Sequence, residues 1–92
     1  MSANLFGFPD KVGLRGDRMS LRLTFRRKVE FEKGHSARVY LFEDAEGNHF
    51  AWFTDSVKLL KAGMSYSLTA TIKRHRAFQG VPQTVLENCR FN

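Results

Sequence analysis

The sequence predicts an all-β domain, a five-stranded Greek-key barrel with one short helix between the third and fourth strands. Three observations support this prediction. In several segments apolar and polar residues alternate with a period of two, as in strands that bury one face. Asp44-Ala45-Glu46-Gly47 is a strong turn signal between two such segments, because glycine readily adopts the left-handed backbone that closes a hairpin. The chain has 92 residues, of which 42% are hydrophobic, and this length suits one domain rather than a two-domain enzyme.

The first three strands are expected before residue 55. The segment 21–31 alternates, and its pattern breaks at Arg27-Lys28, which predicts a β-bulge that bends the strand. Residues 37–43 and 49–54 are rich in valine and aromatic side chains and form the second and third strands. Trp52 is interpreted as a core residue. The outward row of the first strand is Arg22, Thr24, Arg26 and Lys28.

The pairing of the second and third strands decides which of their side chains face the core. With Glu43 opposite Asn48, Leu41 lies on the core side of the sheet. Tyr40 and Phe42 then lie on the other side, where they are available to a ligand. A shift of one residue would exchange the two sets, because successive side chains of a strand point to opposite faces.

The second half of the chain contains a helix signal and the last two strands. Residues 54–56 offer a helix N-cap and residues 61–63 a helix end at glycine, which predicts a helix of about two turns. The segment 64–73 has the most regular alternation in the chain and is the fourth strand. The fifth strand covers 81–91, with Pro82 at its beginning, where a missing amide donor is tolerated.

This order of elements matches the oligonucleotide/oligosaccharide-binding (OB) fold, a small Greek-key barrel. The segment from His75 to Cys89 resembles a His-x-x-Phe-x-Gly-x-x-Gln-Thr-x-Leu-x-x-Cys pattern of small OB-fold domains from bacteriophages and other mobile elements. With Gly63-x-x-Tyr66 and an upstream Gly-x-x-Gly-Asp-Arg, the resemblance extends over roughly residues 13–91. We therefore expect a loosely held N-terminal arm at 1–12 and an OB-fold domain at 13–92. Relatives of this type often belong to replication or recombination proteins.

The amino-acid composition limits which classes of partner and which cellular locations we expect. Fifteen Lys and Arg against nine Asp and Glu give a formal net charge of +6, which favours a polyanionic partner such as nucleic acid. A single cysteine, Cys89, excludes an intramolecular disulfide and is interpreted as a small buried side chain. The three histidines lack the spacing of metal ligands, so neither a metal nor a cofactor is expected. No apolar run approaches the roughly 20 residues that cross a bilayer, and we expect a cytoplasmic protein of a bacterial or phage-infected cell.

The OB-fold resemblance implies that a single strand binds across the second and third strands and the loops beside them. Tyr40 and Phe42 would then provide stacking surfaces, each worth about 1–3 kcal/mol per base. Basic side chains would follow the phosphate backbone and make the affinity salt-dependent. The candidate nucleic-acid-binding residues are Arg22, Arg26, Lys28, Lys33, His35, Arg38, Tyr40, Phe42, His49, Phe53, Lys73, Arg74, His75 and Arg76.

Three functions are compatible with the residues alone. The favoured one is sequence-tolerant binding of single-stranded DNA or RNA without catalysis, in phage or mobile-element replication or recombination. The second is a protein-interaction or inhibitor module of phage origin that uses the same barrel face, with a protein partner or a second copy of the chain. The third is a small ribonuclease, in which Glu30, Glu32 and His35 would supply the acid and base. The sequence leaves oligomeric state and the choice between DNA and RNA open.

Overall fold

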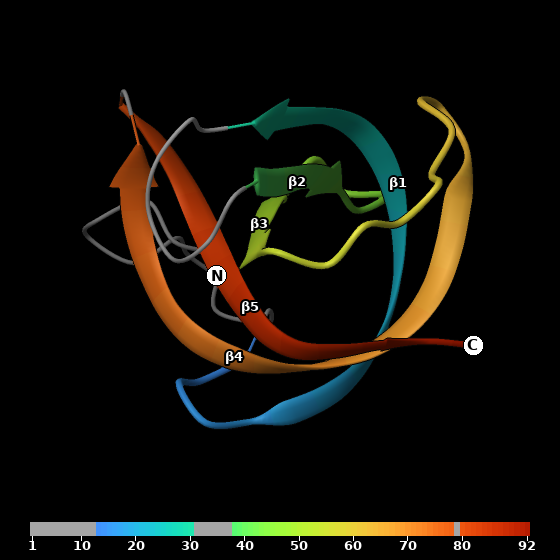
Figure 1. Ribbon diagram of the computed structural model, residues 1–92. Coiled ribbons are helices and arrows are strands. Elements are labelled where there is room, and N and C mark those ends of the chain that lie inside the picture. Colours follow the sequence, from blue (N-terminus) through green and yellow to red (C-terminus); the bar gives the residue numbers. More distant parts are fainter. Residues whose placement is uncertain (1–12, 31–37, 79) are drawn as a thin grey trace.

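The computed structural model describes residues 13–30, 38–78 and 80–92, and these form a five-stranded barrel (Figure 1). The strands are β1 (Arg18–Glu30), β2 (Arg38–Glu43), β3 (His49–Thr54), β4 (Ser65–Phe78) and β5 (Val81–Phe91). They close in the order β1-β2-β3-β5-β4, and β4 pairs back onto β1. All pairs are antiparallel except the parallel pair β3–β5. The predicted all-β, five-stranded barrel is confirmed, whereas the arm predicted at 1–12 lies outside the described residues.

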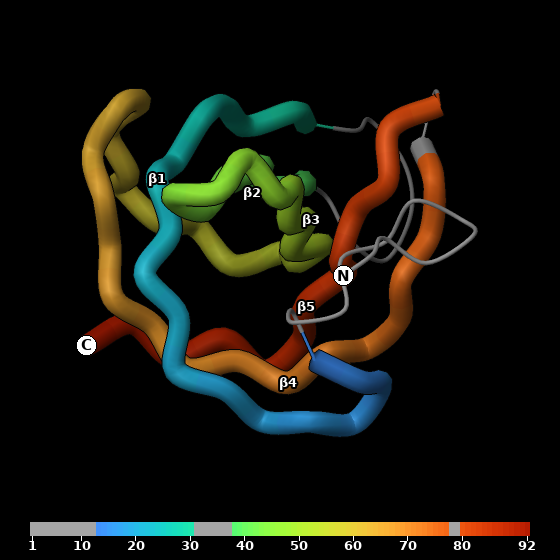
Figure 2. The backbone as a smooth tube through the Cα atoms, turned by 180° about the vertical axis from the view of Figure 1, so that it is seen from behind, coloured from blue at the N-terminus to red at the C-terminus, as the bar shows by residue number. Residues whose placement is uncertain are grey.

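Strand β1 is long enough to border two walls of the barrel. Its residues 18–24 pair with β4, and its residues 24–30 pair with β2, so the strand passes between the two neighbours in both views (Figures 1 and 2). The β1–β2 register shifts between Phe25 and Arg27, which places the bulge at Arg26, one residue before the predicted break. A bulge increases the local twist and bend, and here it lets one strand serve both walls.

The β2–β3 hairpin is paired one residue differently from the prediction. Glu43 lies opposite His49, not Asn48, because the connection has five residues rather than four. The Asp44 carboxylate holds this longer turn: Oδ1 accepts the N–H groups of Glu46 and Asn48, each at 2.9 Å, and Oδ2 accepts the Asn48 side-chain amide at 2.8 Å. Side-chain acceptors of this kind stabilise turns that a backbone pattern alone does not reveal.

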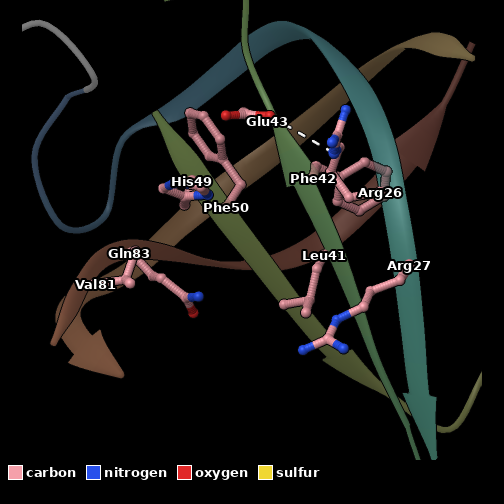
Figure 3. Close-up of a pocket in the computed structure, with 9 residues that line it drawn as sticks. All are labelled: Arg26, Arg27, Leu41, Phe42, Glu43, His49, Phe50, Val81 and Gln83. Carbon is pink, nitrogen blue, oxygen red and sulfur yellow. Dashed lines mark ion pairs between the residues drawn. The ribbon is translucent and has the colours of Figure 1, made fainter. Parts of the chain in front are cut away.

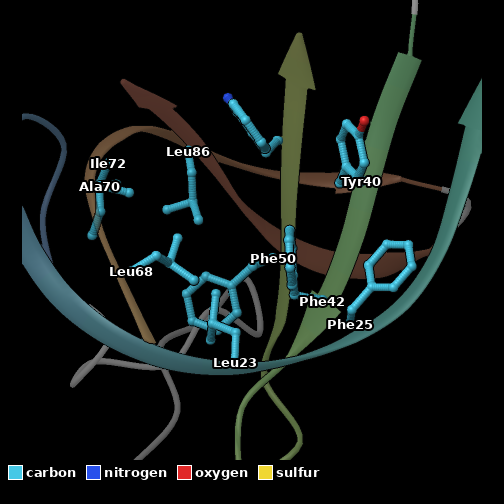
Figure 4. Close-up of a cluster of buried hydrophobic side chains, with 10 residues drawn as sticks. Leu23, Phe25, Tyr40, Phe42, Phe50, Leu68, Ala70, Ile72 and Leu86 are labelled. Atoms are coloured by element: carbon cyan, nitrogen blue, oxygen red, sulfur yellow. The ribbon is translucent and has the colours of Figure 1, made fainter. Parts of the chain in front are cut away.

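The register change moves Tyr40 and Phe42 into the barrel. Their exposed fractions are 0% and 1%, so the expectation that these rings face a ligand is wrong. Tyr40 lies opposite Trp52 with ring centroids 5.3 Å apart, and Phe42 lies opposite Phe50. Figure 4 shows the rings of Tyr40, Phe42 and Phe50 inside the barrel, together with leucine and isoleucine side chains from β1, β4 and β5. The prediction that Trp52 belongs to the core is confirmed.

Residues 55–64 connect β3 to β4 without a helix, so the predicted two-turn helix is wrong. The Tyr40 hydroxyl donates to the Ser56 carbonyl at 3.1 Å and accepts the Lys58 N–H at 2.8 Å. Arg38 Nη1 donates to two carbonyl oxygens of the same segment, at 2.6 and 3.2 Å. A helix this short is marginal in water, and these contacts from β2 satisfy backbone groups that it would have used.

Candidate nucleic-acid interface

The outer side of the β2–β3 hairpin carries the odd-numbered residues of both strands, because the even-numbered ones point inward. Leu41 and Phe53 are half-buried on this side, and His49 is exposed. Val39 and Ala51 lie on the same side and are buried. The accessible apolar part of the outer side is therefore limited to Leu41 and Phe53, and the end near the turn is polar.

A depression of about 470 Å³ opens at that polar end (Figure 3). Arg26 and Arg27 extend into it from β1, Leu41 and Glu43 from β2, and His49 from β3. The full lining is Arg26, Arg27, Leu41, Phe42, Glu43, His49, Phe50, Val81 and Gln83. It is a place where a flat, hydrogen-bonding group can lie between apolar and cationic side chains.

The two arginines of β1 differ in their partners. Arg26 Nε lies 3.6 Å from Glu43 Oε1, and both side chains are partly exposed. An ion pair of this kind contributes about 0–1 kcal/mol, so an incoming phosphate can compete for the guanidinium. Arg27 has no ion pair or side-chain hydrogen bond with the residues that the structure describes. Its five N–H donors are available to a ligand.

Strand β4 contributes two more arginines from the opposite side. Arg74 lies opposite Val85 and Arg76 opposite Gln83, both on the outer side of the sheet. The Arg76 guanidinium carbon lies 5.5 Å from the centroid of the Phe53 ring, within the range of a cation–π contact. Because β5 separates β4 from β3, the Arg76 side chain crosses β5 to reach that ring.

These observations define one surface, which we call the basic face. It consists of Arg26, Arg27, Leu41, His49, Phe53, Arg74, Arg76 and Gln83. Arginines border it on both sides, and an apolar strip, which consists of the half-buried Leu41 and Phe53, lies between them. Five of the residues predicted from the sequence are brought together here: Arg26, His49, Phe53, Arg74 and Arg76.

Two of the cationic residues predicted to bind nucleic acid, Lys28 and Arg38, instead form contacts within the fold. Lys28 Nζ lies 3.4 Å from Glu30 Oε2, and Arg38 Nε lies 3.5 Å from the same oxygen. The hydrogen bond and charge of Lys28, followed by the contact with Arg38, lower the pKa of the Glu30 carboxyl. Arg38 also holds the β3–β4 connection, so its guanidinium is engaged on two sides. Neither residue is part of the basic face.

His75 is also held in place by the fold. Its Nδ1 lies 3.1 Å from the Thr84 hydroxyl, and its Nε2 lies 2.9 Å from the Gly13 carbonyl oxygen. Thr84 is 1% exposed and faces the interior opposite His75. A histidine with both ring nitrogens engaged in this way positions chain segments rather than a ligand.

The other predicted residues lie elsewhere. Tyr40 and Phe42 belong to the core, although an edge of Phe42 reaches the depression. Arg22 lies on the β1–β4 wall, and Lys73 lines a smaller depression of about 390 Å³ beside Glu87. Lys33 and His35 lie outside the described residues.

The sequence interpretation missed Arg27, Leu41 and Gln83. Arg27 faces outward because the bulge at Arg26 shifts the alternation of β1 by one residue. Arg27 therefore pairs with Leu41, which lies on the outer side. Leu41 faces outward because the turn has five residues. The sequence signal for that longer turn is Asp44 itself, because an aspartate side chain often accepts backbone N–H groups of its own turn, as it does here from Glu46 and Asn48.

Other chemistries find little support in the described part of the chain. It contains no group of three His, Cys, Asp or Glu side chains placed to hold a metal ion. Of the residues considered for ribonuclease activity, Glu30 is engaged by Lys28 and Arg38, and the other two lie outside the described residues. Among the residues that the structure describes, there is no helix long and apolar enough to cross a membrane.

Comparison with known proteins gives one informative match. The structure is similar to the OB domain of a protein from Methanosarcina mazei, determined by solution NMR, with a TM-score of 0.59. The similarity covers 86% of this chain and 73% of the other, at 19% sequence identity. The chain has the OB fold. No protein-family profile matches the sequence, and no curated protein matches it. The resemblance of the OB-fold C-terminal segment to phage and mobile-element domains therefore stays a prediction.

Proposed function

We propose that this protein binds single-stranded nucleic acid, DNA or RNA, with little sequence preference, through the basic face of its OB barrel. The observation that carries the proposal is the placement of Arg26 and Arg27 from β1 and Arg74 and Arg76 from β4 on two sides of one apolar strip. Residues 50 positions apart in sequence supply the same charge to the same surface. An extended polyanion matches this arrangement.

Each part of the basic face has a role in the proposal. The four arginines contact phosphates, as charged and multidentate donors do. Phe53, held under Arg76, offers a ring edge or face to a base, and a stacked base is worth about 1–3 kcal/mol. His49 and Gln83 lie opposite each other and supply hydrogen bonds at the open end. Tyr40 and Phe42 have no part in it, because they support the barrel from inside.

The biological setting is part of the same proposal. The resemblance of the segment 75–89 to domains of phages and mobile elements supports a role in their replication or recombination. In such processes transient single strands are the common substrate.

Fluorescence anisotropy with a labelled oligothymidine tests the proposal. With four phosphate contacts, the affinity should fall about 50-fold between 50 and 200 mM salt, from a slope of about −0.7 per contact on single strands. Arg74→Gln should lower that slope by about 0.7, whereas Lys58→Gln, which removes a charge at the barrel mouth over Phe91, should leave it unchanged. Flat titrations at both salts would contradict the proposal.

A protein-interaction role is the second candidate, and one observation favours it. Val57, Leu59 and Met64 on the β3–β4 connection are exposed at 66%, 95% and 51%. Exposed apolar side chains in one segment are typical of protein contacts. If the oligonucleotide titrations are flat while Leu59→Ser abolishes capture of a protein from host extract, the second function replaces the first.

A further inference from the structure

The wall formed by β1 and β4 has a different surface from the basic face. On its outer side, Arg18, Ser20, Arg22 and Thr24 of β1 stand opposite Thr71, Thr69, Ser67 and Ser65 of β4. Every cross-strand pair thus contains a hydroxyl side chain, and two of the pairs contain an arginine. Arg90 of β5 adds a third arginine beside Thr69. We call this surface the hydroxyl–arginine wall.

Two arginines of this wall, Arg18 and Arg22, have neutral partners. Arg22 Nη1 donates to the Ser67 hydroxyl at 3.1 Å. Arg18 Nη1 donates to the Thr71 hydroxyl at 2.9 Å and to the Asn88 carbonyl at 3.0 Å. Among the described residues, none of the three arginines forms an ion pair with a carboxylate. Their charge is therefore not neutralised, unlike that of Arg26, Lys28 and Arg38.

Carboxylates lie at both ends of the described wall. Glu87 stands opposite Thr71, and Asp17 precedes β1, where its carboxylate accepts the Leu14 N–H at 2.8 Å. At the other end, the Thr24 and Ser65 hydroxyl groups lie 3.0 Å apart, and Glu43 of β2 stands opposite Thr24 and forms an ion pair with Arg26. The positive charge of the wall is thus carried by its middle, where Arg22 and Arg90 lie, and Glu43 on the way to the basic face is paired with Arg26.

The two surfaces are joined by β1. Arg22 and Arg26 are four residues apart on the same strand and both point outward, so their Cα atoms are separated by about 13 Å at about 3.3 Å per residue. No gap in the sheet interrupts this path, because β1 runs without a break from one wall to the other (Figure 1).

We propose that the hydroxyl–arginine wall is a second contact region for the phosphate backbone of a single strand already held on the basic face. This inference rests on the proposed function and extends it along β1. The printed bonds of Arg18 and Arg22 use one guanidinium nitrogen each, which leaves other donors for phosphate oxygens. Hydroxyl groups add donors that contact phosphate without reading the base. Since the outward residues of this wall include no aromatic ring, its contribution is electrostatic and independent of base identity.

Oligothymidines of two lengths test the inference. One of about 6 nucleotides suits a single barrel face, and one of about 20 exceeds the 4–16 nucleotides that one OB fold covers. After correction for the number of positions at which the protein can bind each oligonucleotide, the wild-type protein should bind the longer one at least 5-fold more tightly. Its affinity for the longer one should also depend more steeply on salt. Arg22→Gln should remove most of that gain, lower the salt slope for the long oligonucleotide by about 0.7, and leave the short one unchanged.

The controls separate this inference from the proposed function. Lys58→Gln removes the same charge away from both surfaces and should change neither length, and thermal unfolding of both variants should match the wild type. If the wild type gains nothing from length, or Arg22→Gln affects both lengths equally, the wall is no contact region although the basic face still binds. If neither oligonucleotide binds, the proposed function fails and the inference fails with it.

Discussion

Tyr40 and Leu41 are neighbours in β2, yet one is fully buried and the other lies on the surface that we propose to bind nucleic acid. The inner side of the β2–β3 hairpin holds the barrel together through Tyr40, Phe42 and Trp52. The outer side presents Leu41, His49 and Phe53. A single residue in the length of the connecting turn decides which set is inside. In a closed barrel of this size, aromatic content therefore does not by itself identify a binding face.

The largest expected effect comes from truncating a side chain on the inner side of the β2–β3 hairpin. Tyr40→Ala removes a fully buried ring and the hydroxyl that bonds the β3–β4 connection, and it should lower the free energy of unfolding by about 3–5 kcal/mol. Leu41→Ala, on the outer side, should cost about 1 kcal/mol or less. Urea unfolding of the two variants measures the contrast. Equal losses would mean that both residues contribute to the core.

The turn between β2 and β3 determines which side chains face inward, and it provides the next test. Asp44→Ala removes the acceptor of two backbone N–H groups and of one side-chain amide, and should destabilise the protein by about 2 kcal/mol. Asp44→Asn retains one side-chain oxygen and should recover part of that loss. A destabilisation below 0.5 kcal/mol for Asp44→Ala would show that the register is set elsewhere.

Much of the fold follows from periodicity in the sequence. The third and fifth strands have the predicted bounds, and the second ends where predicted, because alternation and the proline at position 82 are local signals. The predicted start of the second strand, residue 37, lies outside the described residues. The first strand begins at Arg18, before its clear alternation starts, and the fourth extends to Phe78, beyond the predicted end at 73. Both extensions pair with β4 or β5 and so depend on neighbours distant in sequence.

The site was harder to predict, because it depends on side chains that meet only after folding. Arg38 looked like a ligand-binding cation, but its guanidinium binds carbonyl oxygens 17 and 18 residues away. His75 looked similar, but it bridges Thr84 and Gly13. Residue type and strand parity do not reveal such partners. Arg74 and Arg76, which were expected on or near a loop, lie within β4, and their role in binding stays a prediction.

The same contrast between a structural and a binding role can be tested with two arginines, Arg38 and Arg74. Arg38→Gln should destabilise the protein by about 1–2 kcal/mol, because a charged donor to two carbonyl groups is lost. Its affinity for oligothymidine should stay within 2-fold of the wild type. Arg74→Gln should show the reverse, with stability changed by less than about 0.5 kcal/mol and binding weakened. Parallel urea unfolding and anisotropy on the two variants would reveal whether structural and binding cations are in fact separate.

The smallest expected effect concerns Cys89, which packs against the core from β5. Burial raises the pKa of its thiol from 9.0 to about 12. The Cys89 thiol therefore stays protonated to a higher pH in the folded protein than in the unfolded chain. The thiol's contribution to stability is complete below about pH 9 and is lost as the pH rises toward about 12, because only the unfolded chain ionises in that interval.

Cys89→Ala isolates this contribution from the lysines and tyrosines that titrate in the same interval. The stability of the wild type should fall more steeply than that of the variant between pH 8.5 and pH 10, as measured by urea unfolding at each pH. The folded thiol should also react with iodoacetamide at pH 8 more slowly than the thiol of the urea-unfolded chain, since the thiolate is the nucleophile. Parallel stability curves together with equal alkylation rates would place Cys89 in water, and the inner side of β5 would then end before residue 89.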